Sequence, residues 1–390
     1  MLRFAQFGAG RIGTIHAANL ASTGATMLRY IVDVNSAAAA VLAAKHGAHV
    51  ADVATALGDP QIDAVIIASS TDTHAELIIA AARAGKAIFC EKPIDLSLKR
   101  VDQCLAAVKK AKVPMFVAFN RRFDPSFAAL QARITRGDIG NVEQVIVTSR
   151  DPGLPPISYI KVSGGQFRDM TIHDFDMARW LLGEEPVEVF AYGSCLVDPA
   201  VGKVGDTDTV MVLMKTASGR QAHINNSRRA AYGYDQRLEV HGSQGRLLAG
   251  NRTPTTVELA NGAHVSTDKP MYFFLERYAE AYRAELAAFV DAVINKKPMP
   301  VGVEDGRMAI VLAEAALKSL KDWGPTEIFA PLSYQRRFDH QAGAKRPYHS
   351  HQRLKATQDM DTVPRQGLKV HRVCLSPVTP STPLPPGAAH

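Results

Sequence analysis

LRFAQFGAGRIG, residues 2–13, decides the fold of this 390-residue chain. Its first half has the apolar character of a buried strand, and its second half has the glycine spacing G-x-G-x-x-G. Gly8 permits a tight turn, Gly10 lets the backbone approach a pyrophosphate, and Gly13 allows the following helix to pack closely. The backbone N–H groups of Arg11 and Ile12 would open that helix and face the phosphates. The stretch therefore predicts a dinucleotide-binding turn.

Apolar strands and alanine-rich helices alternate through the first third of the chain. Alternation at this spacing predicts a doubly wound parallel α/β sheet of the Rossmann type, with ligands at the carboxyl ends of the strands. The strands are expected at Leu2–Phe7, Met27–Val34, Ala64–Ser69, Ala87–Cys90 and Met115–Phe119, and the helices near residues 12–22, 36–46, 73–84 and 98–111.

Asp33 supports the same interpretation, because it ends the second expected strand 20 residues beyond Gly13. A carboxylate at that place can accept hydrogen bonds from both ribose hydroxyls of a dinucleotide. It would repel a 2′-phosphate, and Val34-Asn35-Ser36 supplies no arginine to bind one. We therefore expect NAD rather than NADP. The alternative is that Asp33 is an ordinary turn residue.

The third strand is also followed by polar residues. Ser69, Thr71 and His74 are candidate cofactor contacts, and a structural role is the alternative for His74. Thr73 and Glu76 have the spacing of a capping box, which predicts that the next helix begins at Thr73.

The fourth and fifth strands end in Glu91-Lys92-Pro93 and Asn120-Arg121-Arg122. Glu91 and Lys92 are candidate cofactor contacts, and a lysine at this edge of the sheet is also placed for chemistry. An exposed surface position is the alternative for Lys92. Either Arg121 or Arg122 could contact substrate hydroxyls or hold a nearby carboxylate.

Charge and cysteine content exclude several classes of protein. The net charge is +7, but residues 331–390 hold nine Lys/Arg and three Asp/Glu, which leaves 36 basic and 35 acidic residues in 1–330. A nearly neutral body does not predict nucleic-acid binding. No apolar run reaches the length of a membrane span, and the first residues lack the pattern of a secretory signal. The four cysteines are far apart without a CxxC pair, so we expect no disulfides and a cytoplasmic location.

The segment GGQFRDMTIHDFDMARW, residues 164–180, has the apolar spacing of a helix. Asp169 and His173 are four residues apart, so a single helix would point both side chains the same way. A carboxylate and an imidazole that converge on a half-buried helix indicate a functional site, and a helix cap plus a core histidine is the alternative. Metal binding by this pair is another alternative, but the spacing offers no third ligand and we expect no metal. Asp174 and Asp176 are expected to be structural.

A second region is predicted beyond residue 122 as an α+β domain with an antiparallel sheet, because short strands are separated by hairpin turns. We expect a NAD-binding domain over residues 1–122 and a substrate-binding and oligomerisation domain over 123–330, whose last helix can pack back on the first domain. Residues 331–390 are expected to be a disordered basic tail rich in Pro and His, which is either a recruitment tail or the product of read-through or a shifted reading frame past the usual stop. The strands are expected at Val142–Arg150, Val187–Leu196, Thr209–Lys215, Arg220–Asn226, Arg237–His241 and Thr256–Glu258, and the closing helices near residues 275–295 and 304–321.

GAGRIG, FCEKP, NRRFD, SRDP and DMTIHDFD together resemble the oxidoreductase family of glucose–fructose oxidoreductase and inositol dehydrogenase (Gfo/Idh/MocA), over about residues 1–330. Within this family, residues 149–186 are most similar to bacterial inositol 2-dehydrogenases. The resemblance implies a Rossmann domain plus an open-faced antiparallel sheet, the exposed side of which often forms a subunit interface; the resembling enzymes are homotetramers. It also implies three catalytic residues and a set of polyol contacts. The catalytic residues would be Lys92, Asp169 and His173, and the polyol contacts Arg121, Asp151, Asp169, His173 and Tyr234.

The expected function is NAD-dependent oxidation of a cyclic polyol, first of all myo-inositol to 2-keto-myo-inositol, by hydride transfer to nicotinamide. His173 would accept the hydroxyl proton, Asp169 would orient it or join the relay, and Lys92 would hold the developing alkoxide. scyllo-Inositol or an aldose such as glucose is the alternative substrate. A non-catalytic regulator that senses NAD or sugar is the alternative from another class.

Overall fold

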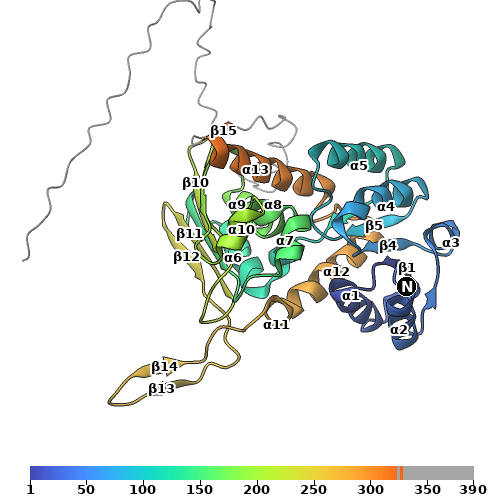
Figure 1. Ribbon diagram of the computed structural model, residues 1–390, viewed down its shortest axis with the longest axis horizontal. Coiled ribbons are helices and arrows are strands. Elements are labelled where there is room, and N and C mark those ends of the chain that lie inside the picture. Colours follow the sequence, from blue (N-terminus) through green and yellow to red (C-terminus); the bar gives the residue numbers. More distant parts are fainter. Residues whose placement is uncertain (323–325, 328–390) are drawn as a thin grey trace, which may run out of the picture. The chain divides into compact units, whose positions relative to one another are not determined.

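A computed structural model describes residues 1–322 and 326–327 of the chain. These residues form a six-stranded parallel sheet and a seven-stranded mixed sheet, with helices packed on both (Figure 1). Within the described part of the chain, no helix is long and apolar enough to cross a membrane. The expected tail, residues 331–390, lies outside the described residues.

The first sheet has the order β3-β2-β1-β4-β5-β6, so the chain order reverses between β1 and β4. In such sheets, the ligand crevice lies at the carboxyl ends of the strands at this switch point. The sheet contains β1 (Leu2–Phe7), β2 (Thr26–Val32), β3 (His49–Val50), β4 (Ala64–Ile67), β5 (Ala87–Cys90) and β6 (Met115–Val117). Its helices are α1 (Arg11–Ala21), α2 (Ser36–His46), α3 (Val53–Gly58), α4 (Thr71–Arg83) and α5 (Leu98–Ala111).

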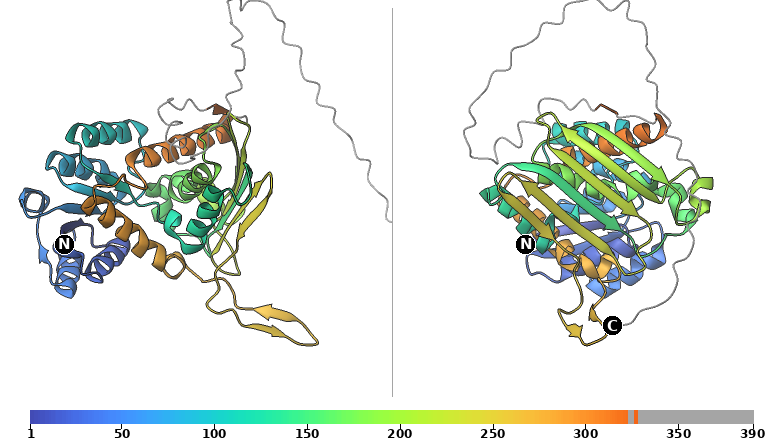
Figure 2. Two further views of the ribbon diagram at one scale, coloured as in Figure 1. Left: turned by 180° about the vertical axis from the view of Figure 1, so that it is seen from behind. Right: turned by 90° about the vertical axis from the view of Figure 1, so that its left-hand side faces the viewer.

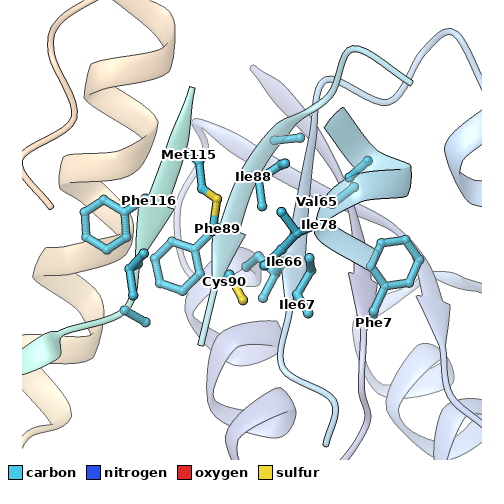
Figure 3. Close-up of a cluster of buried hydrophobic side chains, with 14 of the residues drawn as sticks. Phe7, Val65, Ile66, Ile67, Ile78, Ile88, Phe89, Cys90, Met115 and Phe116 are labelled. Carbon is cyan, nitrogen blue, oxygen red and sulfur yellow. The ribbon is translucent and has the colours of Figure 1, made fainter. Parts of the chain in front are cut away.

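The core of the first sheet explains why its central strands read as continuous apolar runs. Every residue of β4 and β5 is buried, as is typical of parallel strands that are covered on both faces. Figure 3 shows Ile66 and Ile67 of β4 beside Ile88 and Phe89 of β5. The rings of Phe89 and Phe116 are stacked with centroids 5.0 Å apart, which links β5 to β6.

The second sheet has the order β12-β11-β7-β10-β9-β8-β15. Its neighbours are antiparallel with one exception, because β7 and β10 run parallel from Gln144 beside Gln221 to Arg150 beside Ser227. The expected antiparallel sheet is therefore mixed at its centre. The strands are β7 (Val142–Arg150), β8 (Pro186–Ser194), β9 (Thr209–Thr216), β10 (Gln221–Ser227), β11 (Asp235–Gly242), β12 (Gly245–Ala249) and β15 (Thr326–Glu327), while β13 (Glu258–Ala260) and β14 (Val265–Thr267) form a separate hairpin that projects away from this sheet (Figures 1 and 2).

Helices cover one face of the second sheet and leave the other face open (Figure 2, right). The alternation along β9 shows the two faces, since Val210, Val212 and Met214 are buried while Met211 and Leu213 are exposed. The helical segments after β6 are η1 (Asn120–Phe123), α6 (Pro125–Arg136), α7 (Ile157–Ser163), α8 (Gly165–Asp169), α9 (Ile172–Leu182), α10 (Pro199–Lys203), α11 (Phe274–Arg277), α12 (Ala279–Ile294) and α13 (Val303–Asp322).

Helix α13 contacts both sheets. Near its start, Gly306 packs so closely on the first sheet that an added Cβ would lie 2.5 Å from Ile94, in the turn after β5, and 3.3 Å from Val117 of β6. Near its end, the hydroxyl of Ser319 accepts a hydrogen bond of 3.0 Å from the backbone N–H of Ala191 in β8. The expected domain boundary at residue 122 lies within η1, between the two sheets, and stays a prediction.

Two short elements were not expected, and one expected helix start was wrong. The region between residues 46 and 64 contains β3 and α3, neither of which the sequence indicated, because both are very short. Helix α4 begins at Thr71 after the cap residue Ser70, so Thr73 is inside the helix and the expected capping box does not form. The hydroxyl of Thr73 instead donates to the carbonyl of Ser70 over 2.7 Å.

Candidate active site

The glycine loop after β1 has the close contacts that a dinucleotide-binding turn requires. Gly8 has a φ of +109°, and a Cβ there would lie 2.3 Å from the carbonyl oxygen of Ala68. A Cβ on Gly13 would lie 2.2 Å from the carbonyl oxygen of Gly8. The buried amide of Gln6 donates to the carbonyls of Gly8 and Gly13 over 2.9 and 2.8 Å, which fixes the loop. Gly10 caps α1 without a side-chain bond, so the first N–H groups of the helix stay available to phosphate.

Asp33 lies directly after β2 and holds the same loop. One carboxylate oxygen accepts from the N–H of Ala9 over 2.6 Å, and the other accepts from the N–H of Asn35 over 2.7 Å. Each oxygen keeps a second lone pair, so the carboxylate can still accept from ribose hydroxyls. The residues present therefore fit NAD. The neighbouring residue, Val34, is fully exposed and offers no basic group to a 2′-phosphate.

The residues after β4 are held mainly by one another. The hydroxyl of Ser69 lies 2.7 Å from that of Thr73. His74 is buried, and its two ring nitrogens lie 2.8 Å from the carbonyl oxygen of Pro93 and 3.1 Å from that of Ser69. The imidazole thus ties the end of β4 to the turn after β5. This geometry favours the structural alternative for His74, and the cofactor contacts of Ser69 and Thr71 stay predictions.

The expected single helix over residues 164–180 is divided into α8 and α9. In an unbroken helix, the carbonyl of Asp169 would accept from the N–H of His173. Here the N–H of His173 bonds to the carbonyl of Met170 instead, over 3.3 Å. The freed carbonyl of Asp169 accepts from the ammonium of Lys92 over 3.0 Å. The break between α8 and α9 therefore lets Lys92, in the turn after β5, bond to the last residue of α8.

The carboxylate of Asp169 has three cationic or hydroxyl neighbours. One oxygen accepts from the hydroxyl of Tyr159 over 2.9 Å and lies 4.0 Å from the ammonium of Lys92. The other oxygen accepts from the buried guanidinium of Arg228 over 3.1 Å. No hydrogen bond joins Asp169 to His173 in the described structure. The spacing of four residues suggested that Asp169 pairs with His173, and the structure does not form this pair. The side chain that Asp169 contacts is instead Lys92.

The parallel pairing of β7 and β10 brings Asp151 and Arg228 together, because the two strands end at the same edge of the sheet. The N–H of Asp151 donates to the carbonyl of Ser227 over 2.9 Å, and the two side chains approach to 3.9 Å. Burial raises the pKa of Asp151 to about 6, although Arg228 opposes this rise. Asp151 is consequently ionised at neutral pH and able to accept from a hydroxyl.

Two cations, Lys92 and Arg121, act on His173. Burial, followed by the cations Lys92 and Arg121, lowers the pKa of His173 well below its ordinary value near ~6.5. Its Nδ1 is shielded and has no hydrogen-bond partner among the described residues. The imidazole is therefore uncharged at neutral pH, which is the state that can accept a proton.

The two arginines after β6 both hold carboxylates. Arg121 forms a buried ion pair with Asp174, and Arg122 pairs with Asp176 at 2.5 Å. These pairs connect η1 to α9 and agree with the structural role expected for both aspartates. Tyr234 is buried with its ring centroid 6.0 Å from that of Tyr278. The substrate contacts of Arg121 and Tyr234 stay predictions.

The structure brings together four of the residues predicted for catalysis and substrate contact, Lys92, Asp151, Asp169 and His173, at the carboxyl edge of the first sheet. Their roles stay predictions. Sequence reasoning missed Tyr159 and Arg228, which hold Asp169. Arg228 could have been found, since it lies two residues after the expected strand Arg220–Asn226, much as Asp151 follows the expected strand Val142–Arg150. Tyr159 lies ten residues before Asp169 in a different helix, and no spacing rule points to it.

The glycine loop, Asp33 and the lysine at the end of β5 define a dinucleotide-dependent oxidoreductase. Residues 2–119 match the NAD-binding Rossmann fold of an oxidoreductase family, and residues 131–328 match the C-terminal alpha/beta domain of the same family. The chain belongs to this family, whose members include glucose–fructose oxidoreductase and inositol dehydrogenase, and its cofactor is NAD.

Three relatives illustrate the similarity. The inositol 2-dehydrogenase of Rhizobium meliloti is 50% identical over 321 residues, which cover 82% of this chain and 97% of the relative. The myo-inositol 2-dehydrogenase of Thermotoga maritima is 49% identical over 323 residues, again 82% and 97% of the two chains. The crystal structure of a myo-inositol dehydrogenase from Corynebacterium glutamicum has a TM-score of 0.82 and 42% identity, and covers 85% of this chain and all of that one. The expected family and fold are confirmed.

Proposed function

We propose that this protein oxidises myo-inositol to 2-keto-myo-inositol with NAD. It is a dehydrogenase that acts on a CH–OH group, and the two relatives that are about half identical to it are an inositol 2-dehydrogenase and a myo-inositol 2-dehydrogenase. The observation that supports the proposal most is the contact of Lys92 with Asp169, because it sets a cation at the edge of the cofactor sheet beside an uncharged imidazole. Bound NAD supplies the hydride acceptor.

The chain's own residues would manage the proton and the charge. Lys92, oriented by Asp169, would place its ammonium at the reacting hydroxyl and stabilise the developing alkoxide. His173 would accept the hydroxyl proton, because its lowered pKa keeps the ring uncharged, and so able to accept, at neutral pH. Asp151, as an ionised acceptor, would hold another hydroxyl of the polyol. These three roles match a substrate with several adjacent hydroxyls.

NADH production from a panel of polyols tests the proposal. The panel contains myo-inositol, scyllo-inositol and glucose, with NAD as cofactor and absorbance as the readout. We expect the highest kcat/KM with myo-inositol, and a loss of about a hundredfold or more in kcat for Lys92→Ala and His173→Ala. Near-normal turnover by either variant would contradict the assignment. NADH binding without turnover of any polyol would favour the sensing regulator.

We also propose that the protein is a homo-oligomer that associates through the open face of the second sheet. Ile146, Met211 and Leu213 are exposed there, and the register sets Ile146 and Leu213 on either side of His223. A hollow on the same face is lined by Ile146, Phe190 and Leu213 among others. An apolar surface on a sheet that helices leave uncovered is typical of an interface between subunits.

A cytoplasmic location is part of the proposal. Cys90, Cys104 and Cys195 are unpaired, and burial raises the pKa of each thiol. Free thiols of this kind are typical of proteins in a reducing compartment. Fractionation of the producing cells with an antibody to the chain tests the location.

A further inference from the structure

Three ionisable side chains meet in the core behind Lys92. They are His16 of α1, Glu91 directly after β5, and Glu285 of α12, and one oxygen or nitrogen atom from each lies within 4.8 Å of the others. The Nε2 of His16 lies 2.8 Å from one oxygen of Glu91. The other oxygen of Glu91 accepts from the backbone N–H of Lys92 over 3.3 Å. Glu91 thus connects the helix that begins at the glycine loop to the peptide that carries Lys92.

Glu285 is the unusual member of this cluster. It is completely buried, and neither carboxylate oxygen has a hydrogen-bond partner among the described residues. The ionisable groups that face it are Glu91, His16 and, on its own helix, Tyr282. An ionised carboxylate without a partner is very costly in such a place, and a second carboxylate nearby increases the cost. Burial, followed by the charge of Glu91, raises the pKa of Glu285 well above its ordinary value.

A divalent metal ion is the other way to neutralise these groups. Structural zinc sites take four protein ligands, and no fourth His, Cys, Asp or Glu joins the three in the described part of the chain. The aromatic rings of Phe89 and Tyr282 pack against His16 with centroids 5.0 and 5.9 Å away. These two rings pack the site on its His16 side. A proton on Glu285 fits the site better.

We propose that His16, Glu91 and Glu285 form a positioning cluster for Lys92, in which Glu285 is an uncharged acid and Glu91 is the ionised carboxylate. His16 donates to Glu91, and Glu91 holds the N–H of Lys92. The role of Lys92 itself rests on the proposed function, whereas the charge state of Glu285 does not. The cluster makes the position of the cofactor helix and the position of Lys92 depend on each other.

The charge state of Glu285 is tested by unfolding in urea at several pH values, with Glu285→Gln beside the full-length wild type. The side chain of Gln has nearly the shape of the neutral acid but does not titrate. Because its pKa is raised in the folded state, Glu285 takes up a proton on folding above pH ~4.3, and its contribution is lost as the pH rises towards the folded value. Over this range, the wild-type unfolding constant should rise about tenfold per pH unit relative to the variant.

Two results would overturn this part of the proposal. One is a constant ratio of the two unfolding constants across pH, which would mean that Glu285 is ionised in the folded protein. The other is a stoichiometric divalent metal in the purified wild type that Glu285→Gln has lost. Glu280→Gln is the matched control, since Glu280 lies on α12 with its side chain 48% exposed and pairs with Arg252 on the surface.

The positioning role is tested with Glu91→Gln, after wild-type NADH production from a polyol has been established. We expect kcat to fall about tenfold or more in Glu91→Gln, and Glu285→Gln to keep its kcat. Displacement of Lys92 would also remove a charge that lowers the pKa of His173, so the acid limb of the kcat profile should move to higher pH. An unchanged profile and kcat in Glu91→Gln would contradict positioning. Absence of wild-type activity would refute the proposed function, while the unfolding comparison would still stand.

Discussion

Replacement of Arg228 by Met is the sharpest test of the site, because Arg228 acts on two of its carboxylates. Its guanidinium donates to Asp169 over 3.1 Å and lies 3.9 Å from Asp151, and only 2% of the side chain is exposed. Met preserves the length and the packing of the side chain but removes the charge. Tyr159 and Lys92 would continue to hold Asp169. The larger change should therefore occur at Asp151.

The distance sets the size of the effect. Two unit charges 3.9 Å apart interact by about 4 kcal/mol at an effective dielectric constant near 20, and by about 1 kcal/mol in water. The side chain of Asp151 is 23% exposed, so we expect a value in the lower part of this range. One pKa unit corresponds to about 1.4 kcal/mol. The pKa of Asp151, about 6 in the wild type, should thus rise by roughly one unit or more.

The pH dependence of kcat/KM for myo-inositol measures this change. The ionised carboxylate of Asp151 accepts from a hydroxyl more strongly than the neutral acid does, so activity should fall as the pH drops through its pKa. In Arg228→Met, the acid limb should move from near pH 6 to about pH 7 or above, with KM raised at neutral pH. Arg229→Met is the control, because Arg229 is exposed and, among the described residues, its side chain bonds only to the carbonyl of Leu196. An acid limb that coincides with that of the wild type would refute the reasoning.

Three further variants test the cofactor turn and the open sheet face. Gly13→Ala should weaken NADH binding, measured by fluorescence, about tenfold or more, because its Cβ meets the Gly8 carbonyl at 2.2 Å; Gly24→Ala, where a Cβ meets nothing within 4 Å, should leave binding unchanged. Asp33→Ala should reduce the ratio of kcat/KM for NAD over NADP, and an unchanged ratio would show that Asp33 does not discriminate. Leu213→Asp should shift the mass measured by light scattering towards the monomer, and an unchanged mass would place the interface elsewhere.

The first sheet could be predicted almost completely from the sequence, and the reasons are local. The strands Leu2–Phe7 and Ala87–Cys90 end where they were expected, since an apolar run followed by a glycine or a charged turn marks a buried parallel strand. β3 was missed because its two residues, His49 and Val50, are both exposed and carry no apolar pattern. The start of α4 was missed because Thr73 and Glu76 have capping-box spacing by coincidence.

The site could be predicted only in part, because its decisive contacts join distant residues. Lys92 and Asp169 are 77 positions apart, and the sequence between them does not show that the helix ends at Asp169. The spacing of Asp169 and His173 suggested a pair that the helix break prevents. The contact between Arg228 and Asp151 depends on β7 and β10 running parallel, whereas hairpin turns in the sequence favoured antiparallel neighbours. Strand direction of this kind is decided by the packing of the whole sheet.

Helix α13 should make the thermal unfolding of the two sheets cooperative. Its first turns are packed on Ile94 and paired with Asp102 of α5, while its later turns bond to Arg168 and to the backbone of β8. Loss of either sheet would therefore remove the partners of this helix on that side and destabilise the other sheet. Residues 1–322 should then unfold in one cooperative transition, with equal calorimetric and van't Hoff enthalpies, rather than sheet by sheet. The proposed catalytic groups, which come from the regions of both sheets, would then lose their arrangement at the same temperature.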